Sequence, residues 1–93
     1  MSTLTNVIAK YINSTGTIYS GAANLAGYHI KPGGTAGSIE IKDGGSSGTL
    51  LATIDITTDT SVITALLPGN GIRFNNGIYV SLPTSATITV FLG

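Results

Sequence analysis

Four acidic side chains are the groups of this 93-residue chain that could perform enzymatic chemistry: Glu40, Asp43, Asp55 and Asp59. Two carboxylates on facing strands form the catalytic pair of glycosidases. However, Asp43, Asp55 and Asp59 lie at or beside turns, where aspartate is favoured because its carboxylate bonds backbone N–H groups. Asp55 and Asp59 also lack the glycine-containing loop of oxygen ligands that is typical of calcium sites. We therefore expect solvated turn residues rather than a catalytic pair or a metal site.

His29 is the only histidine, and it lies between Tyr28 and Ile30 in an extended segment. A general base needs a partner and a pocket, and a metal site needs several ligands. The chain has no cysteine, so thiolate ligands are excluded. We expect a surface or interface histidine, no enzymatic activity, no metal and no cofactor.

The segment Gly44-Gly45-Ser46-Ser47-Gly48 is glycine-rich but lacks the Lys-Ser/Thr ending of a phosphate-binding loop. It also precedes a segment of alternating apolar residues rather than a helical one. We interpret it as the turn of a hairpin in which Asp43-Gly44-Gly45 and Gly48 supply positive φ angles.

Composition limits the kinds of partner. Only 9% of residues are charged and the net charge is zero, whereas an average domain has about 25% charged residues. The four cations (Lys10, Lys31, Lys42 and Arg73) are scattered, so we expect no nucleic-acid partner. No apolar run approaches the ~18 residues of a membrane span, and no signal peptide is visible. So little charge is typical of a protein that rests against other protein, although an extracellular or crystal-like setting would also fit.

Tyrosine is favoured at interfaces because it combines a large apolar ring with a polar tip. The candidate interface residues are Tyr11, Tyr19 and Tyr28. The segment 2–20, which contains two of them, is the candidate attachment surface. Core packing and stacking on a ligand are the alternative roles for these rings.

Alternating apolar residues predict strands, since successive side chains leave opposite faces. The expected strands are 7–12, 17–20, 25–31, 38–42, 49–56, 61–67, 72–74, 78–82 and 87–92, with one helical turn as the alternative for 7–12. The expected core residues are Ile39, Ile41, Leu50, Ala52, Ile54, Ile63, Ile78, Val80, Ile88 and Val90. Asn75-Asn76-Gly77 predicts a two-residue hairpin turn between its flanking strands.

Turn signals recur about every 8–12 residues, as in a β-sandwich or barrel. No segment predicts the crossover helix that parallel strands need. The sequence therefore predicts an all-β fold: a single antiparallel β-sandwich over 1–93, jelly-roll-like, with about eight short strands. Residues 1–5 are the part that could form a loose N-terminal arm.

Two motifs in the chain match a known family. The first runs Lys42-Asp43-Gly44-Gly45-Ser46-Ser47-Gly48-Thr49-Leu50-Leu51-Ala52-Thr53-Ile54 and is followed by Leu67-Pro68-Gly69. The second runs Gly71-Ile72-Arg73-Phe74-Asn75-Asn76-Gly77-Ile78-Tyr79-Val80-Ser81-Leu82, before a closing strand at 87–91. From about Ala26 to the end, roughly two-thirds of the chain resembles small virion proteins of tailed bacteriophages, especially short-tailed phages of marine bacteria.

The resemblance implies a structural part of the virion, assembled in the host cytoplasm. The expected function is that of a capsid decoration (cement) protein that packs on the major capsid protein or another virion protein, with a homo-oligomer expected. The alternative is a carbohydrate- or host-surface-binding module displayed on the particle as a knob or fibre component. The resemblance implies no catalysis, no nucleic-acid partner and no membrane partner.

Overall fold

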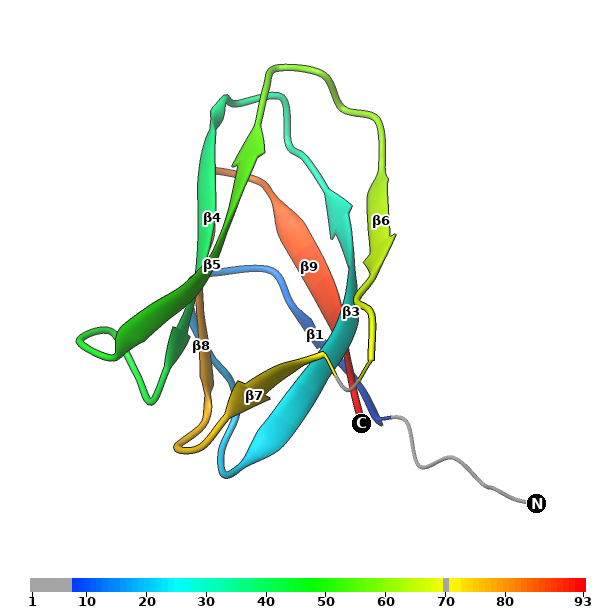
Figure 1. The fold of residues 1–93 in the computed structure, drawn as a ribbon. Coiled ribbons are helices and arrows are strands. Elements are labelled where there is room, and N and C mark those ends of the chain that lie inside the picture. Colours follow the sequence, from blue (N-terminus) through cyan, green and yellow to red (C-terminus); the bar gives the residue numbers. More distant parts are fainter. Residues whose placement is uncertain (1–7, 70) are drawn as a thin grey trace.

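The computed structural model describes residues 8–69 and 71–93, which form two antiparallel sheets and contain no helix (Figure 1). The strands are β1 (Ile8–Ile12), β2 (Gly16–Tyr19), β3 (Ala23–Lys31), β4 (Gly37–Asp43), β5 (Thr49–Ile56), β6 (Ile63–Leu66), β7 (Ile72–Phe74), β8 (Ile78–Ser81) and β9 (Thr87–Leu92). The predicted all-β sandwich is confirmed, with nine strands rather than about eight. The possible arm at 1–5 and the expected strand start at Val7 lie outside the described residues.

The first sheet has the strand order β1-β9-β3-β6, and β7 pairs with the beginning of β3 on the side that β6 uses further along. The second sheet has the order β2-β8-β4-β5. β3 and β9 form the centre of the first sheet, and β8 and β4 form the centre of the second. The order fits a β-sandwich, but a jelly-roll topology is not shown.

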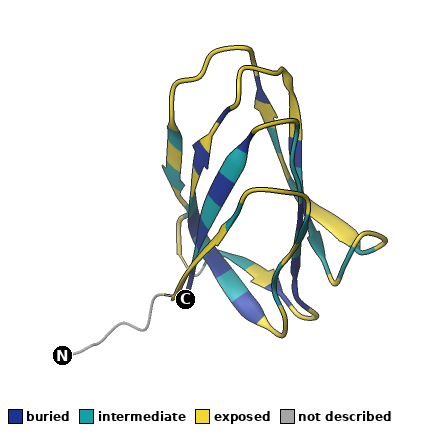
Figure 2. Ribbon diagram, turned by 180° about the vertical axis from the view of Figure 1, so that it is seen from behind, coloured by how far each residue is buried: buried dark blue, intermediate teal, exposed yellow. Residues whose placement is uncertain are grey.

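The core lies between the inner faces of the two sheets, so buried and less buried residues alternate along the central strands (Figure 2). Six predicted core residues are fully buried: Ile39, Ile41, Ile78, Val80, Ile88 and Val90. Ala52, Ile54 and Ile63 are partly buried against this cluster. Leu25, Ile30 and Phe74, absent from the predicted core, are also fully buried.

Leu50 was expected in the core, and this prediction is wrong: Leu50 is 47% exposed. Ile41 pairs with Ala52, but its neighbour Lys42 pairs with Leu50, so one residue of β5 is unmatched at this point. Such a β-bulge reverses the alternation beyond it. Leu50 therefore shares the outer face with Lys42.

Gly48 does not have the positive φ that was expected; Gly44 and Gly45 do, at 105° and 149°. Gly48 is nevertheless required for space. A Cβ atom there would lie 2.0 Å from the carbonyl oxygen of Asp43, because the turn folds back on that carbonyl.

Replacing Ile41 with alanine should lower the free energy of unfolding by roughly 2–5 kcal/mol, since the side chain is fully buried and would leave a cavity. The matched control is Leu50→Ala, which should change it by less than about 1 kcal/mol because Leu50 is outside the core. Urea unfolding measures both. Equal effects of the two variants would contradict the β5 register described here.

Candidate functional surface

Asp43 ties together two turns that are distant in sequence. Its carboxylate accepts hydrogen bonds from the backbone N–H groups of Asn75 (3.1 Å) and Asn76 (2.8 Å). The N–H of Gly44 donates to the carbonyl of Gly77 at 3.1 Å. The turn after β4 and the turn at 75–77 thus meet at one end of the sandwich, and the Asp43 carboxylate is the acceptor that joins them.

The same contacts correct the expected hairpin at Asn75-Asn76-Gly77. β7 pairs with β3 in the first sheet, whereas β8 lies in the second sheet between β2 and β4. The three residues therefore carry the chain from one sheet to the other, and only Gly77 has positive φ, at 125°. Bonds to Asp43 and Gly44 replace the strand pairing that a hairpin would supply.

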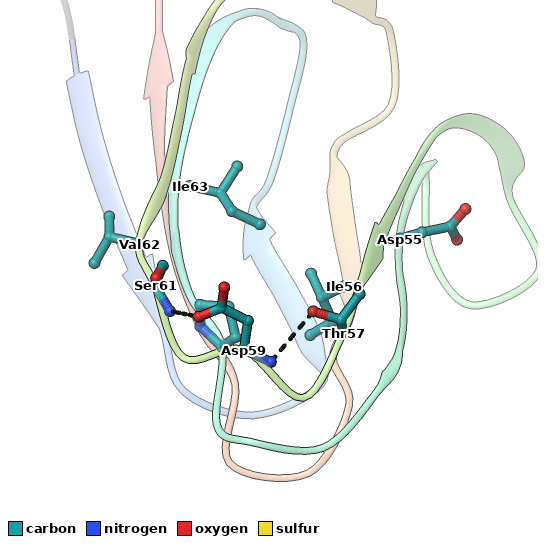
Figure 3. Close-up of a pocket in the computed structure, with 8 residues that line it drawn as sticks. Asp55, Ile56, Thr57, Asp59, Ser61, Val62 and Ile63 are labelled. Carbon is teal, nitrogen blue, oxygen red and sulfur yellow. Dashed lines mark hydrogen bonds between the residues drawn. The ribbon is translucent and has the colours of Figure 1, made fainter.

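A hollow of about 230 Å³ lies where the β5–β6 connection joins the sheets (Figure 3). It is lined by Pro32, Asp55, Ile56, Thr57, Asp59, Ser61, Val62 and Ile63. Hydrogen bonds from the Ser61 backbone N–H and hydroxyl lower the pKa of Asp59 below its ordinary value. The Thr57 hydroxyl accepts the N–H of Asp59 at 3.2 Å. These bonds hold the connection in shape, as expected for a turn aspartate.

The two carboxylates of this hollow point in different directions (Figure 3). Asp55 accepts a 2.7 Å hydrogen bond from the Ser38 hydroxyl on the outer face of the second sheet, and its side chain points away from Asp59 (Figure 3). Within residues 8–69 and 71–93, no group of three His, Cys, Asp or Glu side chains could hold a metal ion.

His29 and Ser46 are both exposed. The Nδ1 atom of His29 lies 3.0 Å from the Thr64 hydroxyl in an exposed pair on neighbouring strands. Residues 44–48 also match the Gly-x-Ser-x-Gly pattern of a nucleophile elbow, which needs a strand-to-helix turn. Here Ser46 is exposed at the tip of the β4–β5 hairpin, with a strand on both sides.

The three candidate interface tyrosines have different environments. Tyr11 is 62% exposed on β1. Tyr28 is partly buried against the core. Tyr19 also packs against the core, and the Lys10 ammonium lies 5.9 Å from the centre of its ring where β1 meets β2. Of the three, Tyr11 offers a surface to a partner.

The outer face of the first sheet carries further apolar side chains in the row next to Tyr11. Residues that pair across strands share a face, and the pairing places Ala9, Phe91, Gly27 and Leu66 in one row. The adjacent row contains Tyr11, Thr89, His29 and Thr64. We call these eight residues the β1–β6 face. Leu66, 81% exposed, and Phe91 were missed by the sequence analysis because alternation alone does not show which surface stays uncovered.

Charge is distributed unequally between the two sheets. The strands of the first sheet contain Lys10, Lys31 and Arg73 and no acidic residue. The strands of the second sheet contain Lys42 and the acids Glu40, Asp43 and Asp55. The net charge of the chain is zero, but the strands of the first sheet have a net positive charge and those of the second sheet a net negative charge.

Comparison with protein-family models, curated proteins and solved structures found no match. Within the part of the chain that the structure describes, no helix has the length and hydrophobicity needed to cross a membrane.

Replacing Asp43 with alanine should lower the free energy of unfolding by roughly 1.5–3 kcal/mol, because the Asn75 and Asn76 N–H groups lose a charged acceptor. The control is Asp55→Ala, which removes a carboxylate that accepts one hydrogen bond from a hydroxyl rather than bonds from two backbone N–H groups and should have a smaller effect. Urea unfolding compares the two. A smaller loss in Asp43→Ala than in Asp55→Ala would refute the structural role of the tie.

Proposed function

We propose that the protein is a structural component of a bacteriophage particle, and specifically a capsid decoration protein that packs on the major capsid protein and stabilises the shell. The observation that carries this proposal is the β1–β6 face, with Tyr11, Phe91 and the highly exposed Leu66 in adjacent rows. Contiguous exposed apolar groups mark surfaces that bind protein.

The character of this face fits a protein partner better than other partners. Aromatic residues are enriched at the centre of protein interfaces, and charged residues are depleted there. The rows of the β1–β6 face contain no Asp, Glu, Lys or Arg. Nucleic acid would require clustered cations, and Lys31 and Arg73 lie towards opposite ends of β3.

The motifs behind the phage resemblance support a scaffold role. Asp43 and Gly44 bond the turn at 75–77, so these residues hold the sandwich together. The Asp43 carboxylate and the Gly44 N–H are both used in these bonds, which supports a scaffold role for them. A family that shares them would share a stable β-sandwich whose outer surfaces vary with position on the particle.

The alternative function is a carbohydrate- or host-surface-binding module displayed on the virion. The hollow at the β5–β6 connection favours it, because Thr57, Asp59 and Ser61 bring hydroxyl and carboxylate oxygens beside the apolar Val62 and Ile63. Such groups can bond sugar hydroxyls while apolar side chains contact the ring. Retention of the purified protein on immobilised glycans, lost in Asp59→Ala, would favour this module.

Substituting Leu66 or Tyr11 with serine should reduce binding to particles that lack the protein, because each change removes apolar surface from the β1–β6 face. Co-sedimentation with such particles measures the bound amount. Leu50→Ser is the control, since it removes an exposed apolar side chain from the second sheet instead. Loss of binding in the control alone would place the docking surface elsewhere, and full binding by all three variants would refute docking through this face.

A further inference from the structure

The free edges of the two sheets differ in how well they resist pairing with another chain. An edge strand exposes unpaired backbone N–H and C=O groups, and proteins protect such edges by shortness, bulges or charge. β2, β6 and β7 have only four, four and three residues, and β2 is also bulged. β5 has eight residues and ends its sheet, with no strand on its far side within the described chain.

β1 is protected by charge. Lys10 lies at the middle of its five residues. Antiparallel pairing of two β1 strands about their centre would place Lys10 directly opposite Lys10 of the second copy. Like charges in that position are destabilising.

β5 carries no comparable obstacle beyond its bulge. The register shift lies near Leu51, and the stretch from Ala52 to Ile56 continues without a further shift. Asp55 is the charged residue of this stretch, and the Ser38 hydroxyl already bonds it on the outer face. Figure 2 shows the first part of β5 as largely exposed.

We propose that β5 pairs antiparallel with β5 of a second copy, in a register centred on Ile54. In a continuous sheet, inner-face residues must lie opposite inner-face residues. Centring on Ile54 meets this condition and uses only the regular stretch. It places Ile54 opposite its own copy, Ala52 opposite Ile56, and Thr53 opposite Asp55.

The chemistry of these pairs is complementary. The Thr53 hydroxyl of each copy faces the Asp55 carboxylate of the other, so two polar pairs form on the outer face. The partly buried Ile54 and the buried Ile56 extend the apolar inner face across the junction. Asp55 does not face its own copy, in contrast to Lys10 in a β1 pair.

Introducing a positive or a negative side chain at position 53 tests this arrangement, because the two substitutions should change self-association in opposite directions. Thr53→Lys should strengthen self-association several-fold, because it places a cation opposite Asp55 of the second copy, and Thr53→Glu should weaken it several-fold. Sedimentation equilibrium measures the dissociation constant. Thr17→Lys and Thr17→Glu are the controls, since Thr17 is exposed on the outer face of the opposite edge strand β2, and neither should change association.

Thr53 pairs with Glu40 within its own chain, so thermal melts of dilute samples must show that the variants stay folded. A wild-type protein that remains monomeric up to millimolar concentration would overturn the proposal, as would shifts of the same sign in Thr53→Lys and Thr53→Glu. Neither measurement involves phage particles, so the result is independent of the proposed function.

Cysteine substitution tests the register, because the chain has no native cysteine. An affinity-tagged Thr53→Cys protein mixed with an untagged Asp55→Cys protein should form a mixed disulfide faster than Thr53→Cys links to itself. Faster self-linking of Thr53→Cys would overturn the register centred on Ile54.

Discussion

The contact between the inner faces of the two sheets is the interaction on which the rest of the structure depends. The chain has 93 residues, and a domain of this size can bury only a small core. It has no cysteine, so no disulfide adds to the stability of that core. Within the described residues the buried side chains are apolar, and no polar or charged one is among them. The acidic side chains Asp43, Asp55 and Asp59 lie instead on the outer face and in the connections, where they form the hydrogen bonds that shape turns.

The tie at Asp43 follows from the way the chain crosses between these faces. β7 belongs to the first sheet and β8 to the second, so the residues between them receive no support from a shared strand ladder. Asp43 and Gly44, at the end of β4, supply the missing hydrogen bonds. Two segments more than thirty residues apart therefore depend on each other.

Local alternation and turn residues were sufficient to predict each strand of the described residues, because a half-buried strand imposes a period of two on its own sequence. They failed where distant residues decide the outcome. The bulge opposite Ile41 turns Leu50 outward, the carbonyl of Asp43 leaves no space beside Gly48, and the Asp43 tie converts an expected hairpin into a crossing between sheets. The candidate surface was predicted only at Tyr11, since Phe91 and Leu66 join it through pairing of β9 and β6 with β3.

The β5 edge and the β1–β6 face belong to different sheets, so both can be used at once. Pairing of two β5 strands about an axis perpendicular to the second sheet would leave both first sheets on the same side of the joined sheet. Each first sheet would then direct its β1–β6 face away from the junction and towards one common support. Two linked copies of a weak docking surface bind more tightly than a single copy, provided that both copies can reach their sites at the same time. Pairing through β5 would thereby raise the binding strength of a subunit with little charge and a small core, although the interface of each subunit stays the same size.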